Sequence, residues 1–140
     1  MASLVKNEEV ETCLRELLEA EGYRLNRRRA YGQTGVDIIA EKDGELWHIE
    51  AIGYKSSGPA RAKDFYESFF RIVSRLNDEA RHLVIALSDR AEVGLPARAK
   101  QHAVAWRRIA DAFPELEIWI VKTDGRSYRR TRWLEWLQRA

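Results

Sequence analysis

Two acidic side chains, Asp37 and Glu50, flank a predicted β-hairpin at positions where they could act together. The turn between them is Asp43-Gly44, and Asp-Gly favours a two-residue type I′ turn because both central residues need a positive φ. This turn pairs Lys42 with Glu45, and the residue numbers of every other cross-strand pair then add up to the same value. Asp37 therefore lies directly opposite Glu50, with Cβ atoms about 4.5–5.5 Å apart.

Two carboxylates at this separation repel each other and need a cation, a shared proton or free access to water. Mg²⁺ suits such a pair, because one or two carboxylates hold it while water and substrate phosphate fill its other positions. The alternative is an ordinary half-exposed strand face, since Glu41 and His48 point to the same side as the acid pair. The pattern by itself leaves both interpretations open.

A third acid, Glu11, comes from the predicted first helix. Apolar residues at helical spacing predict this helix over 7–21, and Gly22 ends it. Glu11 lies about 60° from Leu14, the centre of the apolar stripe, at 100° per residue. It therefore either reaches solvent from the edge of the stripe or points at a charged group.

The remaining elements follow from hydrophobic periodicity, turn residues and proline positions. We expect strands over 36–42, 45–52, 82–87 and 116–122, with a short additional strand possible in 23–29. We expect helices over 60–77 and from Pro96 to Phe113, and a short helix over 129–140. The order α-β-β-β-α-β-α-β predicts an α/β fold, a mixed central sheet flanked by helices, with residues 1–140 forming a single domain.

Composition narrows the class of protein. The 140 residues are 45% hydrophobic and 33% charged, which is normal for a soluble globular domain. No apolar run reaches the roughly 20 residues that span a bilayer, and the start lacks the apolar core of a signal peptide, so we expect a cytoplasmic protein with no membrane partner. The lone Cys13 excludes a disulfide framework and a multi-thiolate zinc site, and it is expected to be buried. The three histidines lack metal-ligand spacing, and no motif indicates a small-molecule cofactor.

The net charge is only +2, but the basic residues are mostly arginines and they cluster at 27–29, 71 and 75, 107–108, and 126–132. Arginine presents a planar fork that suits phosphate oxygens, so this clustering hints at nucleic acid, with a solvated charged surface as the alternative. The five tryptophans are expected in the core, although Trp133 and Trp136 could stack on exposed bases.

The segments Gly35-Val36-Asp37-Ile38-Ile39-Ala40 and Trp47-His48-Ile49-Glu50 resemble the PD-(D/E)XK nuclease superfamily, which includes restriction endonucleases and Holliday-junction resolvases. Glu11 followed by Gly22-Tyr23 is similar to the first helix of the resolvases. The segment from Asp64 and the strand at 82–87 are similar to the elements that follow the core in bacterial members. The resemblance runs from about residue 8 to residue 122.

The resemblance implies a restriction-endonuclease-like fold and a metal-dependent DNA endonuclease that uses Mg²⁺ or Mn²⁺. It implies that Asp37, Glu50 and the backbone carbonyl of Ala51 are the metal ligands, with Glu11 assisting. A metal-held water would attack a DNA phosphodiester, and the ion would neutralise charge on the phosphate. By analogy with enzymes that cut two strands, a homodimer is plausible.

One departure from the family pattern concerns the catalytic lysine. The family expects lysine two residues after the glutamate, where this chain has Ile52. Lys55 would point away from Glu50 in a regular strand, but a bulge at Gly53 would reverse the phase and bring it to the same side. Lys63 is a second candidate, and the third possibility is that no lysine serves this role.

Five basic residues are expected to contact DNA: Arg28, Arg29, Lys63, Arg71 and Arg75. Arg71 and Arg75 are one helical turn apart and could clamp a phosphate, or could instead pair with Asp78 or Glu79. Three functions remain open at this point: a metal-dependent DNA endonuclease, an inactive module of the same fold that binds DNA or protein, and a plain α/β interaction protein.

Overall fold

The computed structural model describes residues 4–28 and 37–140. Within them, six strands form one mixed sheet in the order β1-β2-β3-β4-β5-β6. Strands β3, β4 and β5 run parallel, and the pairs β1–β2, β2–β3 and β5–β6 are antiparallel. The strands are β1 (Arg24–Leu25), β2 (Ile38–Lys42), β3 (Glu45–Ile52), β4 (His82–Ser88), β5 (Leu116–Lys122) and β6 (Ser127–Arg132).

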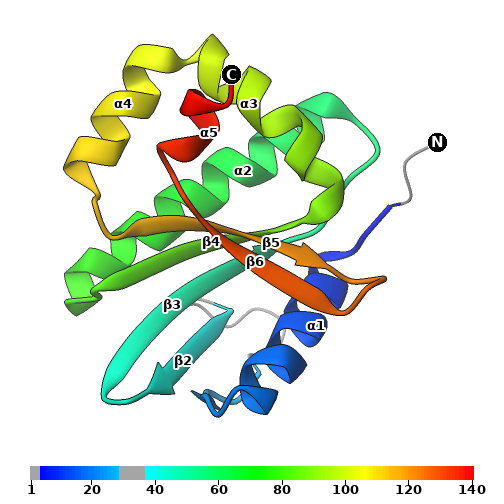
Figure 1. The fold of residues 1–140 in the computed structure, drawn as a ribbon, viewed down its shortest axis with the longest axis vertical. Coiled ribbons are helices and arrows are strands. Elements are labelled where there is room, and N and C mark those ends of the chain that lie inside the picture. Colours follow the sequence, from blue (N-terminus) through cyan, green and yellow to red (C-terminus); the bar gives the residue numbers. More distant parts are fainter. Residues whose placement is uncertain (1–3, 29–36) are drawn as a thin grey trace.

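Helices cover both faces of this sheet (Figure 1). Helix α1 lies on one face, and the other helices lie on the opposite face. The α-helices are α1 (Asn7–Ala20), α2 (Gly58–Val73), α3 (Leu95–Gln101), α4 (Ala103–Ala112) and α5 (Glu135–Gln138), and the 3₁₀ helices are η1 (Ser74–Asp78) and η2 (Asp89–Gly94). The predicted α/β fold with a mixed, helix-flanked sheet is therefore confirmed.

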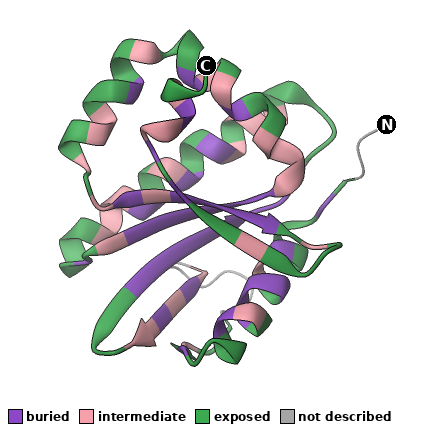
Figure 2. Cartoon of the chain, in the orientation of Figure 1, coloured by how far each residue is buried: buried purple, intermediate pink, exposed green. Residues whose placement is uncertain are grey.

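The sheet separates two hydrophobic cores, because successive strand residues point to opposite faces. Val10, Leu14 and Leu18 of α1 pack on one face, against β-strand residues such as Ile38 and Ile49. On the other face Ile72 of α2 belongs to a core that extends to α3, α4 and α5. Figure 2 shows that the middle strands are buried while the outer sides of the helices are exposed. The central strand β4 is buried on both faces, as its continuous apolar run predicts.

The predicted hairpin is confirmed, including its register. Lys42 pairs with Glu45 and Ile38 pairs with Ile49. Asp43 and Gly44 both have positive φ, at 53° and 80°, as a type I′ turn requires. The short strand anticipated before position 36 is present as β1, which pairs with β2.

Two predicted helices were wrong in part. The helix expected from Pro96 to Phe113 is broken at His102, whose φ of −119° and ψ of 40° separate α3 from α4. The segment 129–140 is helical only over α5, because its first residues form the edge strand β6 beside β5. Pairing with β5 overrides the local helical preference, a tertiary effect that periodicity does not reveal.

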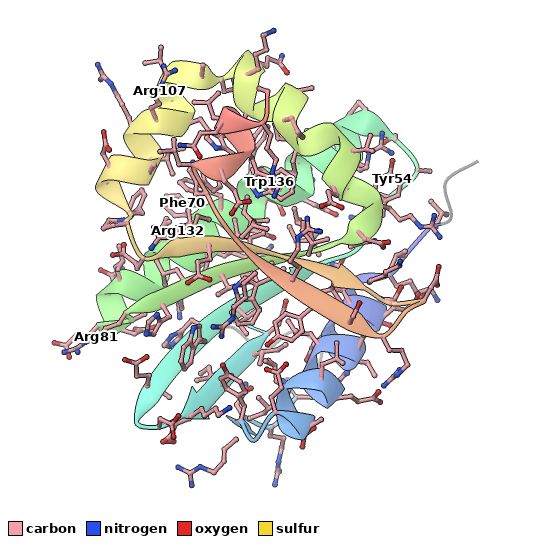
Figure 3. All side chains as sticks on the ribbon, viewed as in Figure 1. Tyr54, Phe70, Arg81, Arg107, Arg132 and Trp136 are labelled. Atoms are coloured by element: carbon pink, nitrogen blue, oxygen red, sulfur yellow. The ribbon has the colours of Figure 1, made fainter. Side chains whose placement is uncertain are left out.

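The other expectations about the core are confirmed. Cys13 is buried, and all five tryptophans are buried, so Trp133 and Trp136 are not available to stack on exposed bases. Figure 3 places Trp136 among the helices on the α2 face. In the part of the chain that the structure describes, no helix is both long and apolar enough to cross a membrane.

Candidate active site

The hairpin brings Asp37 and Glu50 into direct contact, as its register predicts. Both carboxyl groups line the same cavity, and the backbone N–H of Ala51 donates to Asp37 Oδ2 at 2.8 Å. Glu50 is only 4% exposed. Burial, followed by the charge and hydrogen bond of Asp37, raises the pKa of Glu50 to about 8, while Arg71 and Arg75 act in the opposite direction. At neutral pH the pair therefore holds a proton unless a cation replaces it.

The acid pair lines a polar cavity of about 190 Å³, called here the acidic cavity. Its wall comes from the start of α1, the end of β3 and the middle of α2. The charged side chains that line it are Glu8, Glu11, Asp37, Glu50, Asp64, Glu67 and Arg71. Among the described residues, six carboxyl groups against one guanidinium give the cavity a strong preference for cations.

The donor set of this cavity fits a divalent ion such as Mg²⁺. No three His, Cys, Asp or Glu side chains within residues 4–28 and 37–140 converge as a ready-made ligand group. Mg²⁺ does not need one, because one or two carboxylates normally hold it and water completes its shell. Asp37 and Glu50 supply two carboxyl groups to one cavity, and a cation bound there would relieve the repulsion that raises the pKa of Glu50.

Glu11 lines the acidic cavity but is strongly paired. Its Oε2 accepts from Arg15 Nε at 2.7 Å and lies 3.8 Å from Arg28 Nε. Arg15 is 9% exposed and also donates to the backbone carbonyls of Asn26 and Asp37, at 2.7 Å each. The buried Arg15 guanidinium therefore connects helix α1 to Asp37, the residue that precedes β2 and belongs to the acid pair.

Lys55 does not lie on the acid pair. Its Nζ is 3.0 Å from Asp64 Oδ2, and among the described residues it forms no salt bridge with Asp37 or Glu50. The bulge considered at Gly53 does not form within the strand, because β3 ends at Ile52 and Gly53 lies beyond its pairing with β4. Among the described residues, Asp64 is the one that connects Lys55 to the acidic cavity, because it pairs with Lys55 and lines the cavity.

Gly53 has a different role from the one considered for it. A Cβ at this position would lie 2.0 Å from the carbonyl oxygen of Val5, so the N-terminal segment crosses the chain here at close range. Val5 and Tyr54 form an isolated antiparallel bridge, and Asn7 Oδ1 accepts the N–H of Gly53 at 2.8 Å. These contacts place the beginning of α1 beside the end of β3.

The expected DNA-contacting residues on α2 and η1 lie near the site. Lys63 is 3.8 Å from Glu67, and Arg71 is 3.5 Å from the same carboxylate while lining the acidic cavity. Arg75 pairs with Asp78 at 3.0 Å, which was the alternative considered for it. The positive charges of Arg71 and Arg75 both lower the pKa of Glu50, so both arginines favour the ionised form of this carboxyl group.

On the other side of the site, Arg28 donates to the Thr12 hydroxyl and lies beside Glu11. Arg29 lies outside the described residues, as does the segment 29–36 that leads to Asp37. In the sequence, Arg28 was expected to contact DNA because it lies in a run of arginines. The structure shows in addition that its side chain contacts Thr12 and Glu11 of α1.

Sequence reasoning missed Arg15, Asn26 and Asp64. Asn26 Oδ1 accepts from the N–H of Ile39 at 2.8 Å and from Arg15 at 3.2 Å, so it links β1 to β2. A signal for Arg15 was present, because it is a charged residue four positions after Glu11 and next to Leu14 of the apolar stripe. Asp64 was named only as the start of a segment similar to bacterial members of the family, and nothing in the sequence indicated a role for it in the site.

A mixed α/β sheet whose second hairpin strand carries a buried glutamate against an aspartate defines the restriction-endonuclease-like class of fold. The comparison with protein families agrees with this class. Residues 3–89, more than half of the chain, match the family model Mrr_cat, described as restriction endonuclease. The chain belongs to this restriction endonuclease family, within the PD-(D/E)XK superfamily. Neither the search of curated proteins nor the search of solved structures gave a match.

Proposed function

We propose that this protein is a metal-dependent DNA endonuclease of the PD-(D/E)XK type that hydrolyses phosphodiester bonds. The observation that carries the proposal is the contact between Asp37 and Glu50 inside a cavity lined by six carboxyl groups. A protein gains nothing in stability from burying such a pair, since burial raises the pKa of Glu50 to about 8. Its presence is best explained by a function that uses a cation there.

In this proposal Asp37, Glu50 and the carbonyl of Ala51 hold Mg²⁺ or Mn²⁺. The ion, when bound, supplies an activated water and neutralises charge on the scissile phosphate. Asp37 is held for this task by the Ala51 N–H, and its backbone is held by Arg15. Glu11 takes an assisting part from the rim of the acidic cavity, with its charge balanced by Arg15.

Lys55 is proposed to serve as the displaced catalytic lysine. Its ammonium pairs with Asp64, and Asp64 lines both the acidic cavity and the cavity next to it. Half of the Lys55 side chain is exposed, which leaves the amine room to change partners when a phosphate arrives. Arg28, Arg29, Lys63, Arg71 and Arg75 are proposed to contact the DNA backbone around the acidic cavity.

An inactive module of the same fold is the second candidate. Ile52 stands where the family has lysine, and Lys55 is engaged by Asp64. These two observations favour a protein that binds DNA or another protein and has lost hydrolysis. For either candidate we also propose that the protein forms a homodimer, that it is cytoplasmic, and that residues 1–140 form one domain.

The deciding experiment incubates the protein with plasmid, single-stranded and branched DNA in Mg²⁺ or Mn²⁺. We expect cleavage by the wild type and none by Asp37→Ala, with EDTA abolishing the reaction. Asp111→Asn is the matched control, because Asp111 is an exposed acid on α4. Equal cleavage by wild type and Asp37→Ala would mean a contaminating nuclease, and cleavage by neither would favour the inactive module.

A Lys55→Ala variant separates the two roles that the lysine could have. If Lys55 is catalytic, its removal lowers kcat by about a hundredfold or more while binding of DNA to the protein changes little. Lys100→Ala serves as the comparison, because Lys100 is an exposed lysine on α3 that lines neither the acidic cavity nor the cavity beside it. Equal rates for Lys55→Ala and wild type would show that the lysine is not required.

A further inference from the structure

A second cavity, of about 310 Å³, opens beside the acidic cavity. It lies where β3 and β4 end, between the start of α2 and the segment formed by η2 and α3. Figure 3 shows Tyr54, one of its lining residues, in this region. Ligands of α/β proteins commonly bind outside the carboxyl ends of parallel strands, and β3 and β4 are parallel.

The charges around this second cavity are positive. Arg61, Arg90 and Arg98 line it and define what we call the arginine pocket. The acid in its wall is Asp64, which Lys55 already neutralises. Arg90 is 3.2 Å from Asp124. In the described part of the chain, neither Arg61 nor Arg98 forms a salt bridge with a carboxylate, so two partly buried guanidinium charges remain uncompensated.

These two arginines are oriented by aromatic rings. The Arg61 guanidinium lies 4.6 Å from the centre of the Tyr54 ring, and that of Arg98 lies 5.2 Å from the Phe65 ring. Stacking uses the flat face of a guanidinium and leaves its N–H groups free to donate in the plane. Arg61 spends one donor on the Lys55 carbonyl at 2.7 Å, which fixes its orientation further. The pocket therefore presents guanidinium N–H groups that are already oriented to donate to an oxygen-rich anion.

The two cavities adjoin each other and have opposite charge. Ile52 and Asp64 line both, so a group bound in one lies a single side chain away from a group bound in the other. The acidic cavity favours a cation, whereas the arginine pocket favours an anion. A nucleic-acid strand satisfies both at once, because its successive phosphates can meet the cation site and the anion site in turn.

We propose that the arginine pocket binds a backbone phosphate of the DNA strand, next to the phosphate that the acid pair addresses. This inference rests on the proposed function, because it takes DNA as the substrate. Arg61 and Arg98 are the residues that hold the phosphate, and Arg90 supports them. Their role is to position the strand rather than to take part in the hydrolysis.

The test measures binding of a fluorescent DNA duplex and a single strand by anisotropy, in EDTA and at several salt concentrations. Arg61→Ala and Arg98→Ala are each expected to weaken binding about tenfold. Each should also reduce the slope of log affinity against log salt by about one, since each removes one phosphate contact. Arg98→Lys should retain the slope, because it keeps the charge without the fork.

Arg107→Ala is the matched control. Arg107 is an exposed arginine on α4, and Figure 3 shows it on the opposite side of the helical layer from Tyr54. It should leave both affinity and salt slope unchanged. Thermal unfolding of every variant checks that losing a ring contact has not unfolded the protein. If an alanine variant proves unstable, Arg61→Gln or Arg98→Gln answers the question, because each keeps much of the side-chain length, removes the charge and should still reduce the salt slope by about one.

The outcomes separate this inference from the nuclease proposal. Alanine variants that bind DNA as tightly as the wild type would overturn the arginine pocket, whatever the cleavage assay gives. A wild type that binds DNA through Arg61 and Arg98 but never cuts it would support the pocket and contradict the nuclease. Inorganic phosphate or a mononucleotide that binds through these arginines, with DNA affinity unaffected by their removal, would assign the pocket to a free phosphate compound and also overturn the inference.

Discussion

Asp37 lies beside Glu50, and burial, together with the charge and hydrogen bonding of Asp37, raises the pKa of Glu50. Glu50 is the more buried of the two, and burial is the largest cause of its raised pKa. Two neighbours hold Asp37 in place. The Ala51 N–H donates to its side chain, and the Arg15 guanidinium donates to its backbone carbonyl.

Replacing Glu50 by Gln should stabilise the metal-free protein at pH 8 but not at pH 5. Folding raises the pKa of Glu50 from 4.5 to about 8. The folded protein therefore keeps a proton that the unfolded chain has lost, and the stability of the wild type falls as pH rises from about 4.5 to 8. A glutamine side chain cannot ionise, so the variant escapes this loss, which amounts to a few kcal/mol.

Urea unfolding in EDTA at the two pH values measures this difference. Saturating Mg²⁺ should remove it at pH 8 by stabilising the wild type more than Glu50→Gln. A stability difference that is equal at pH 5 and pH 8 would show that Glu50 ionises normally in the folded protein.

Replacing Arg15 by Met should destabilise the protein by about 3 kcal/mol, since it leaves Glu11 and two backbone carbonyls without their buried donor. Arg24→Ala is the control, because the exposed Arg24–Glu41 pair should contribute below about 1 kcal/mol. Urea unfolding of both variants gives the comparison. Similar losses for the two would mean that the buried contacts of Arg15 are worth no more than a surface pair.

At the scale of elements, the site depends on how three segments meet: the start of α1, the hairpin β2–β3 and the middle of α2. The register of the hairpin places Asp37 opposite Glu50. The close approach of the N-terminal segment to Gly53 places the start of α1 beside the end of β3. The first of these is local in sequence, whereas the second joins segments that are far apart along the chain.

Gly53→Ala should destabilise the protein by about 1–3 kcal/mol, because its Cβ would lie 2.0 Å from the Val5 carbonyl oxygen and the backbone would have to move. Gly94→Ala is the matched control. Gly94 has a φ of −87°, and a Cβ added there would meet no atom within 4 Å, so alanine should be neutral or slightly stabilising. Chemical unfolding distinguishes them, and equal effects would show that the crossing at Gly53 is loose.

At the scale of the whole molecule, the family match and the folded unit have different extents. The match ends at residue 89, yet the core on the α2 face takes much of its volume from later residues. Trp106 and Trp133 stack at 3.9 Å and exchange two hydrogen bonds, each indole N–H donating to the other's backbone carbonyl. These contacts join α4 to the end of β6.

A fragment of residues 1–89 should therefore fail to fold cooperatively. It would lack β5, the partner of β4, and the buried side chains of Ile118, Trp133 and Trp136. Far-UV circular dichroism with urea unfolding tests this against the 140-residue chain. A cooperative transition with an unchanged midpoint would show that the region after residue 89 is not needed for the fold.

The sequence by itself determined the α/β class, the hairpin register and hence the meeting of Asp37 with Glu50. A two-residue turn and the period of a strand are local rules, and they fix which side chains face each other without knowledge of the rest of the chain. The prediction of β5 succeeded for the same reason. The helix predicted over 129–140 was wrong in its first part, because pairing with β5, rather than the local periodicity, makes Ser127–Arg132 extended.

Only the tertiary structure decided which charges neutralise which. Arg15 reaches Asn26 and Asp37 across more than ten residues, and Lys55 pairs with Asp64 instead of the acid pair. Long side chains can choose among several partners, and the choice depends on how helices and strands lie in space. The arginine pocket emerged in the same way, because Arg61, Arg90 and Arg98 come together only when α2, η2 and α3 pack at the ends of β3 and β4.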